Sequence, residues 1–184
     1  MKDSDPDNVL ALRVWVMQCV VILLVVGVLV FFGIAVFIRN GPNPPKAALI
    51  APALTLLGMG CAVLAVALHY IIPPLYVAIA RKQIATGTWN PSTPENPIPA
   101  EQFRMSNVEK FCHVYQLQLA IRATLLAWAN FTNLAAYTLE GDVVSLVVVA
   151  LLLTVQLLHF PTRDRAEHFL SEQGELLRHA RQTM

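Results

Sequence analysis

Four long apolar tracts constrain this chain of 184 residues more than any other feature of its sequence. A helix that crosses the apolar layer of a bilayer, about 30 Å thick, needs roughly 17–25 residues, and each tract provides that length. Hydrophobic residues make up 56% of the chain and charged residues 14%, well below the roughly 25% of ordinary soluble domains. We therefore predict an all-α polytopic membrane protein, because helices satisfy their backbone hydrogen bonds internally in lipid.

The tracts predict four transmembrane helices, over residues 14–38, 47–72, 106–139 and 143–160. Residues 1–13 precede the first helix, and a Gly-Pro-Asn-Pro-Pro turn at 41–45 separates it from the second. Ser106 and Glu109 match a capping box at the start of the third helix. Asp142 is expected to cap the fourth.

The segment between the second and third helices, residues 74–110, is predicted to combine an amphipathic helix with a connector. The Pro73-Pro74 pair should kink or end the second helix at the membrane boundary. Residues 75–85 then form a short amphipathic helix, and residues 89–100 a proline-rich connector with no core of its own. The last segment, residues 161–184, is predicted to be a charged tail with some helical spacing of its apolar residues.

Basic residues predict the orientation of the four spans. With an even number of spans, both ends of the chain lie on one side, which carries ten lysines and arginines, whereas the other side carries two. The ten are Lys2, Arg13, Arg81, Lys82, Arg104, Lys110, Arg163, Arg165, Arg178 and Arg181, and the two are Arg39 and Lys46. By the positive-inside rule, we expect a multi-pass protein of the plasma (inner) membrane with both termini cytoplasmic.

A polar stripe follows the third predicted helix into its apolar part. It consists of Tyr115, Gln118, Arg122, Asn130 and Asn133. Arg122 falls about 5 Å inside the cytoplasmic boundary, so its long side chain can reach the headgroups by snorkelling. The alternative is that its guanidinium binds an anion or a phospholipid headgroup. In either case, such a stripe should face protein rather than lipid.

Small residues follow one face of the second predicted helix. They are Thr55, Gly58, Ala62 and Ala65, and His69 continues the same spacing. Small side chains in this register let another helix approach closely. We therefore expect both stripes to lie in the interior of the bundle or at an interface, either in a homo-oligomer or with another membrane protein.

Three histidines on three predicted helices, His69, His113 and His159, fall at one level near the cytoplasmic boundary. Neutral imidazole is a common metal and haem ligand, but histidines at a membrane interface are also simple amphipathic edge residues. No pair of them has a local ligand spacing, so no cofactor is expected. The cysteines are interpreted as small buried hydrophobic residues; they are Cys19, Cys61 and Cys112.

Several short runs resemble a known family. They are Ile72-Pro73-Pro74, Arg81-Lys82-Gln83-Ile84-Ala85, Val114-Tyr115-Gln116, Asn133 through Gly141, and Phe160-Pro161-Thr162-Arg163. Over residues 47–172 the chain resembles an uncharacterised family of small four-helix bacterial (planctomycete-type) integral membrane proteins. Its members often carry a glutamate where this chain has Leu125-Leu126-Ala127-Trp128-Ala129, a feature similar to the rotary ATPase proteolipid hairpin. The resemblance implies an architecture and no activity.

Three functions fit these patterns. The first is a non-catalytic membrane protein that self-associates or binds a membrane partner. The second is a small transporter or channel subunit with a polar path on the third helix, and the third is a haem or metal protein that uses the three histidines. Enzyme activity has the least support, since the sequence has no phosphate loop, His-Glu-x-x-His or serine elbow. A net charge of +1 gives no support to nucleic-acid binding.

Overall fold

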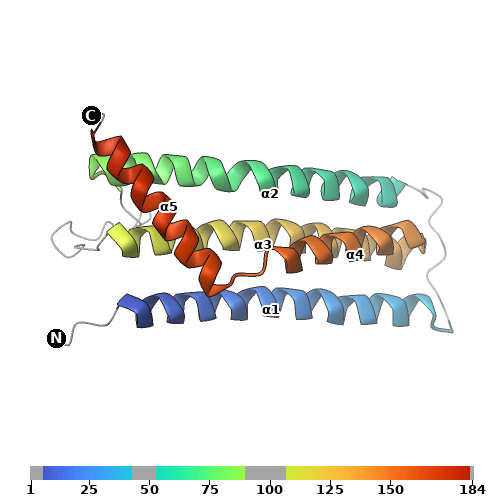
Figure 1. The fold of residues 1–184 in the computed structure, drawn as a ribbon. Helices are drawn as coiled ribbons and strands as arrows, with labels where there is room; N and C mark the ends of the chain where they lie inside the picture. The colour runs from blue at the N-terminus through green and yellow to red at the C-terminus, as the bar shows by residue number, and fades with distance from the viewer. Residues whose placement is uncertain (1–5, 43–52, 90–106, 183–184) are drawn as a thin grey trace.

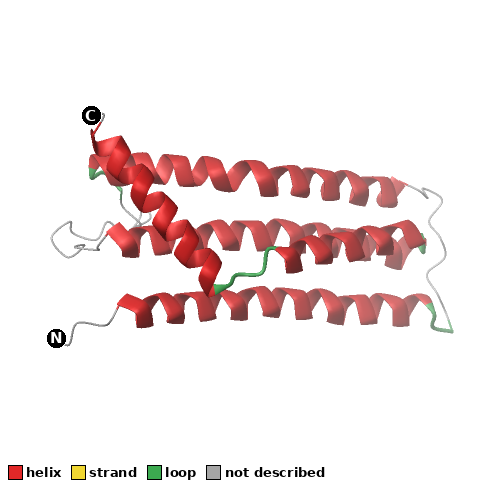
Figure 2. Cartoon of the chain, in the orientation of Figure 1, coloured by secondary structure: helices red, strands yellow, loops and turns green. Residues whose placement is uncertain are grey.

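The computed structural model describes residues 6–42, 53–89 and 107–182, and helices joined by short turns make up these residues (Figure 2). The helices are α1 (Pro6–Arg39), α2 (Ala53–Thr86), α3 (Asn107–Glu140), α4 (Val143–Leu158) and α5 (Arg163–Gln182) (Figure 1). The described part of the chain holds no strand, so the predicted all-α class is confirmed. With 34 residues each, α1, α2 and α3 are about 50 Å long, whereas α4 is about 24 Å long.

The five helices form a bundle with α3 at its centre. α3 contacts all four of the others, and α1, α2 and α4 run alongside it (Figure 1). α4 ends about half-way along the bundle, and α5 then crosses obliquely over the end where α1 begins (Figure 1). α5 contacts α1, α2 and α3 there. The fourth position of the bundle is therefore shared between α4 at one end and α5 at the other.

The central position of α3 explains how it tolerates polar residues. Sixteen of its 34 residues are buried, against nine of 34 in α2. Leu126 packs between α2 and α4, and Leu134 packs between α1 and α4. Because protein surrounds α3 on several sides, its polar side chains do not have to face lipid.

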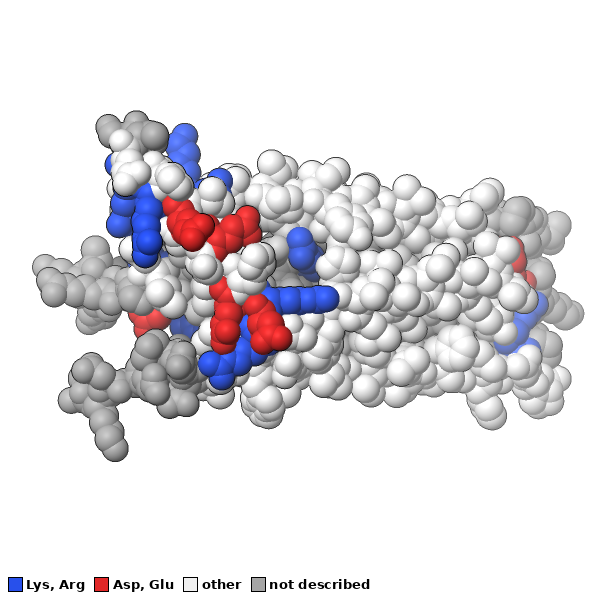
Figure 3. All heavy atoms as spheres, in the orientation of Figure 1, with Lys and Arg blue, Asp and Glu red and all other residues white. Residues whose placement is uncertain are grey.

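Apolar side chains cover the outer faces of the bundle. Leu23 and Phe37 of α1 are 72% and 78% exposed, and Val63 of α2 is 72% exposed. In Figure 3, most charged side chains gather toward the end where α1 begins, a few lie at the opposite end, and a broad uncharged region separates them. An apolar belt between two polar ends is the surface expected of a protein that sits in a bilayer.

Length and composition agree with that surface. Two helices are long and apolar enough to cross a membrane, α1 over Leu10–Arg39 and α2 over its whole length. α4 and α5 would add a third crossing if the pair, which is bent by 66° at its break, counts as one span. The chain thus has the character of a membrane protein.

The prediction of a separate amphipathic helix over residues 75–85 is wrong, because α2 continues without a break through Pro73 and Pro74 to Thr86. Each proline removes a backbone hydrogen bond and crowds the preceding turn. Packing of the residues that follow offsets this cost: Val77, Ala80 and Ile84 are buried against α3 and α5. Tertiary contacts therefore extend a helix that its local sequence favours ending.

The turn between α3 and α4 follows the sequence prediction. The Asp142 carboxylate accepts a hydrogen bond of 3.0 Å from the Val144 N–H, which confirms the predicted cap of α4. Gly141 has a φ of +78°, a conformation that favours glycine. Three predicted features lie outside the described residues: positions 43–45 of the Gly-Pro-Asn-Pro-Pro turn, the connector from residue 90 to 100, and Ser106 of the capping box.

Candidate functional site

Both stripes noted in the sequence lie inside the chain and face one another. On α3, Asn130 and Asn133 are 0% exposed, and Gln118 is 8% exposed. The Asn133 amide donates hydrogen bonds to the Gly58 carbonyl at 3.0 Å and to the Ala129 carbonyl at 2.8 Å. The small residues of α2 are buried against this face; they are Thr55, Gly58, Ala62 and Ala65, followed by His69. The close approach of α2 to α3 is thus made within one chain.

Several buried polar atoms on α2, α3 and α4 meet no hydrogen-bond partner among the described residues. They are His69 Nδ1 and Nε2, Gln118 Oε1, Arg122 Nε, Asn130 Nδ2 and Oδ1, Asn133 Oδ1, and Gln156 Nε2 and Oε1. Buried polar atoms are nearly always paired in folded proteins, so a group of unpaired ones calls for an explanation such as a bound water, ion or ligand. Those on α3 extend from Asn133 to Gln118, toward the end of the bundle where α1 begins.

Two of the three histidines come together. The rings of His69 on α2 and His159 after α4 have centroids 4.7 Å apart, and the His159 Nδ1–H donates to the Val155 carbonyl at 2.9 Å. His113 lies apart from them and packs against Trp89. The hypothesis of one site built from all three histidines is therefore wrong, and the described residues hold no group of three His, Cys, Asp or Glu side chains that could bind a metal.

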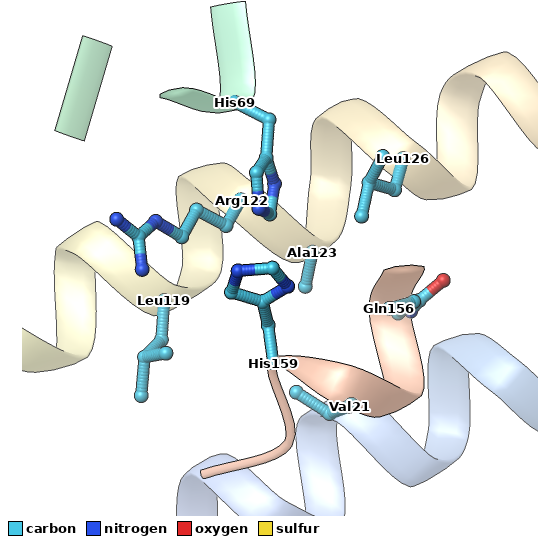
Figure 4. A pocket seen from close by; sticks show the side chains of 8 residues that line it. All are labelled: Val21, His69, Leu119, Arg122, Ala123, Leu126, Gln156 and His159. Atoms are coloured by element: carbon cyan, nitrogen blue, oxygen red, sulfur yellow. The ribbon is translucent and has the colours of Figure 1, made fainter. Parts of the chain in front are cut away.

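A small cavity of about 10 Å³ lies beside the paired histidines, with room for about one water molecule. Its polar lining comes from His69, Arg122, Gln156 and His159 (Figure 4). Figure 4 shows the Arg122 side chain extending away from both imidazole rings, toward the side on which Leu119 lies. The guanidinium therefore lies on the side of this cavity that is nearer to the end of the bundle covered by α5.

A larger pocket of about 370 Å³ lies on that side, at the junction of α3, α4 and α5. Leu119, Arg122 and His159 line both the pocket and the small cavity. The full lining is Tyr115, Gln118, Leu119, Arg122, Leu158, His159, Arg165, His168, Phe169 and Glu172. Three of the five residues predicted as a polar stripe thus meet in one pocket, whereas Asn130 and Asn133 lie deeper in the bundle.

The break between α4 and α5 creates this pocket. α4 ends at Leu158, and Arg165 of α5 turns back so that its Nη1 donates to the carbonyls of Leu158 at 2.8 Å and Phe160 at 3.2 Å. These bonds satisfy two of the carbonyls that are left without partners near the end of a helix. The fold therefore places a second guanidinium at the mouth of the pocket, and a sequence pattern alone did not reveal that Arg165 and Arg122 share a site.

Sequence reasoning also missed the role of Glu140, at the opposite end of α3. Its carboxylate accepts hydrogen bonds from the Leu54 N–H at 2.8 Å, the Thr55 N–H at 2.8 Å and the Thr55 hydroxyl at 2.6 Å. These bonds, led by that of the hydroxyl, hold the pKa of Glu140 below its ordinary value of 4.5. Glu140 therefore caps the first turn of α2 from a different helix, a contact that no local motif signals.

Comparisons of the chain with protein-family models, with curated proteins and with solved structures found no match.

Proposed function

We propose that the chain is a non-catalytic, multi-pass protein of the plasma membrane that holds a ligand in the pocket between α3, α4 and α5. In this proposal α1, α2, α3 and α4 are four spans, and both termini are cytoplasmic. Three observations support it: the apolar belt, the excess of basic residues on the side of the chain ends, and the side-by-side arrangement of α1, α2 and α4 along α3. The pocket then lies at the level of the cytoplasmic headgroups.

The observation that carries this proposal is the convergence of polar groups on a cavity of about 370 Å³. This size is within the range of small-molecule sites, roughly 300–1,000 Å³. The pocket contains cationic, carboxylate, amide, phenol and imidazole groups, and we propose that these groups bind a ligand. Specificity would come from a few placed polar groups on an otherwise apolar wall.

The structure removes one argument for self-association. The small-residue stripe of α2 and the polar stripe of α3 pack against each other, as the hydrogen bond from Asn133 to Gly58 shows. A homo-oligomer, or a complex with another membrane protein, would have to use the apolar outer faces of the bundle instead. We retain association as a proposal for those faces, separate from the pocket.

Occupancy of the pocket can be tested without knowing the ligand. In a chain whose native cysteines are replaced by serine, His168→Cys places a thiol in the pocket lining, and Glu175→Cys places one seven residues further along the same face of α5. We expect alkylation of the first thiol to be slow in native membranes and to accelerate after delipidation in detergent. The second thiol should react at the same rate in both. Equal rates at position 168 before and after delipidation would contradict a resident ligand.

One observation favours a second function, transport. The Glu140 carboxylate stands at the far end of α3, the buried amides of Asn130 and Asn133 lie in the interior, and Arg122 faces the pocket. Together these groups place polar side chains at intervals along α3, from its last residue to the pocket. Reconstituted vesicles that dissipate a proton or ion gradient, and that become tight with Arg122→Leu, would support transport. Vesicles that are tight with the unaltered chain would exclude it.

A further inference from the structure

We infer that the ligand of this pocket is an anionic phospholipid, held by its phosphate group. The inference rests on the proposed function, since it names the chemistry of the molecule that the pocket holds. It depends on three properties of the pocket: its charge, its hydrogen-bond donors and the apolar surface beside it.

The charge of the pocket favours an anion. Arg122 and Arg165 are cationic at all physiological pH values, and Glu172 is the one carboxylate among the described lining residues. The two arginines and the one glutamate of the lining together carry a net charge of +1. A guanidinium that is partly withdrawn from water requires a counter-charge, because an unpaired charge in a low-dielectric setting is costly.

The unpaired Nε–H of Arg122 favours an anion that carries two or more oxygens. Its Nε is buried and has no partner among the described residues, and the group lines the pocket. The Nε–H and a neighbouring Nη–H form a fork that pairs with two oxygens of a phosphate or carboxylate at once. Gln118, which is 8% exposed, adds an amide at the same wall, and its Oε1 also has no partner. A ligand that combines an anionic group with a hydroxyl donor would satisfy both side chains.

The surroundings favour a lipid over a free anion. Leu119, Leu158 and Phe169 form the apolar part of the wall, and Leu158 is itself 64% exposed on the outer surface of α4. The same surface continues at Leu157, which is 56% exposed. Acyl chains can therefore run along α4 while the headgroup enters between α4 and α5. This arrangement matches a phosphodiester that lies at the edge of a bilayer.

The test uses the purified full chain in a neutral detergent, titrated separately with phosphatidylglycerol, phosphatidylcholine and inorganic phosphate. Binding is measured by native mass spectrometry and by the shift of the thermal unfolding midpoint. We expect phosphatidylglycerol to bind at least about tenfold more tightly than phosphatidylcholine, which has the same phosphate but no net charge. Inorganic phosphate should give no shift at millimolar concentration, because it lacks the acyl chains.

Variants separate the pocket from general attraction to a basic surface. Arg122→Gln should weaken phosphatidylglycerol binding by roughly 10- to 100-fold, the usual effect of losing charge-assisted hydrogen bonds. Arg165→Gln, at the more exposed mouth, should weaken it less. Arg181→Gln removes an equal charge from α5 outside this pocket and should leave binding unchanged. If Arg122→Gln does not fold, the comparison of Arg165→Gln with Arg181→Gln provides the decision.

Each other outcome overturns a defined part of the inference. Equal binding of the two lipids would exclude recognition of an anion, and saturation by inorganic phosphate alone would exclude a lipid. Equal losses in Arg122→Gln and Arg181→Gln would show surface attraction rather than a site. If the thiol at position 168 is nevertheless protected in native membranes, the proposed ligand-binding function stands with another ligand. If it is not protected, both proposals fail.

Discussion

At the scale of single residues, Asn133 determines how closely α2 and α3 approach. Its amide nitrogen is fixed by two carbonyls, those of Gly58 and Ala129, and its side chain is 0% exposed. A Cβ on Gly58 would lie 2.7 Å from Asn133 Oδ1 and 3.1 Å from its Cγ. Because the amide nitrogen is held by two hydrogen bonds and the side chain is fully buried, turning away to make room for a Cβ would break those bonds.

Gly58→Ala should therefore destabilise the bundle, by about 1–3 kcal/mol as is usual for overpacked interiors. Gly60 provides a matched control two residues away, since nothing lies within 4 Å of a Cβ placed there. Gly60→Ala should be neutral or stabilising by roughly 0.5–1 kcal/mol, because alanine favours the helix. Thermal unfolding in one detergent compares the two variants. A Gly58→Ala variant as stable as Gly60→Ala would contradict the tight contact with Asn133.

Glu140 should make the stability of the fold depend on pH in the acidic range. The hydroxyl of Thr55 and the two N–H groups of α2 hold its pKa below the ordinary 4.5 in the folded chain. A group with a lowered folded pKa contributes stability that is complete above the unfolded value and is lost as pH falls through the folded value. The contribution of Glu140 should therefore be full at neutral pH and fade below about pH 4.5.

Glu140→Gln measures this contribution, because glutamine cannot ionise and other groups titrate equally in both chains. We expect the unfolding midpoint of the variant to lie below that of the unaltered chain at pH 7, and the difference to shrink below pH 4.5. A difference that stays constant from pH 7 to pH 3 would show that the charge of Glu140 does not stabilise the start of α2.

At the scale of helices, local preference and tertiary packing oppose each other in α2 and cooperate in α5. α2 contains two consecutive prolines but is held by buried residues on either side of them. α5 has few apolar residues, and their spacing matches one face of a helix: Ala166 is 0% and Leu177 3% exposed. Tertiary contacts extend α2 past its prolines, whereas the apolar face of α5 packs onto the bundle.

Pro74 is exposed on α2, whereas Pro73 is fully buried. Pro74→Ala restores the N–H that can bond the Tyr70 carbonyl and removes a poor helix former. We expect a gain in stability of about 1–3 kcal/mol, measured by thermal unfolding. Pro73→Ala should gain less, because it also removes a buried ring. A loss of stability in Pro74→Ala would show that the prolines impose a shape on α2 that the bundle requires.

Leu177 and Leu176 provide a matched pair on α5, at 3% and 38% exposure. Leu177 packs with Ile84 of α2 and Phe111 of α3, so Leu177→Ala should weaken the docking of α5 by about 2–5 kcal/mol. Leu176→Ala should change it by less than about 0.5 kcal/mol. Limited proteolysis of the C-terminal segment reports the difference. Equal protection of the two variants would contradict the docked position of α5.

At the scale of the whole molecule, the distribution of polar groups gives the bundle a direction. Charges concentrate where α1 begins and α5 ends (Figure 3), and the pocket lies on the same side of the apolar belt. The opposite end is closed by the Glu140 cap and by Arg39, whose Nη2 donates to the Glu140 carbonyl at 3.3 Å. One end is thus tied together by hydrogen bonds, and the other leaves an open site.

The proposed topology predicts opposite accessibility for two positions. In the chain without native cysteines, Ser171→Cys on α5 should react with a membrane-impermeant maleimide only in inside-out vesicles. Asn40→Cys, after α1, should react only in right-side-out vesicles. Both positions are exposed, so accessibility depends on the membrane alone. Labelling of both from the same side would overturn the arrangement of spans, and with it the headgroup level assigned to the pocket.

The sequence by itself determined the class of the protein and most helix positions, because apolar tract length and capping residues such as Asp142 act locally. It also indicated that the residues around Gly58 and Asn133 face protein, since polar side chains avoid lipid and small side chains let another helix approach closely. Only the tertiary structure decided what those faces contact, that α2 continues past Pro73 and Pro74, and that Arg165 meets Arg122. These outcomes depend on contacts between residues far apart in the chain, whose energies exceed the local preferences that a sequence pattern records.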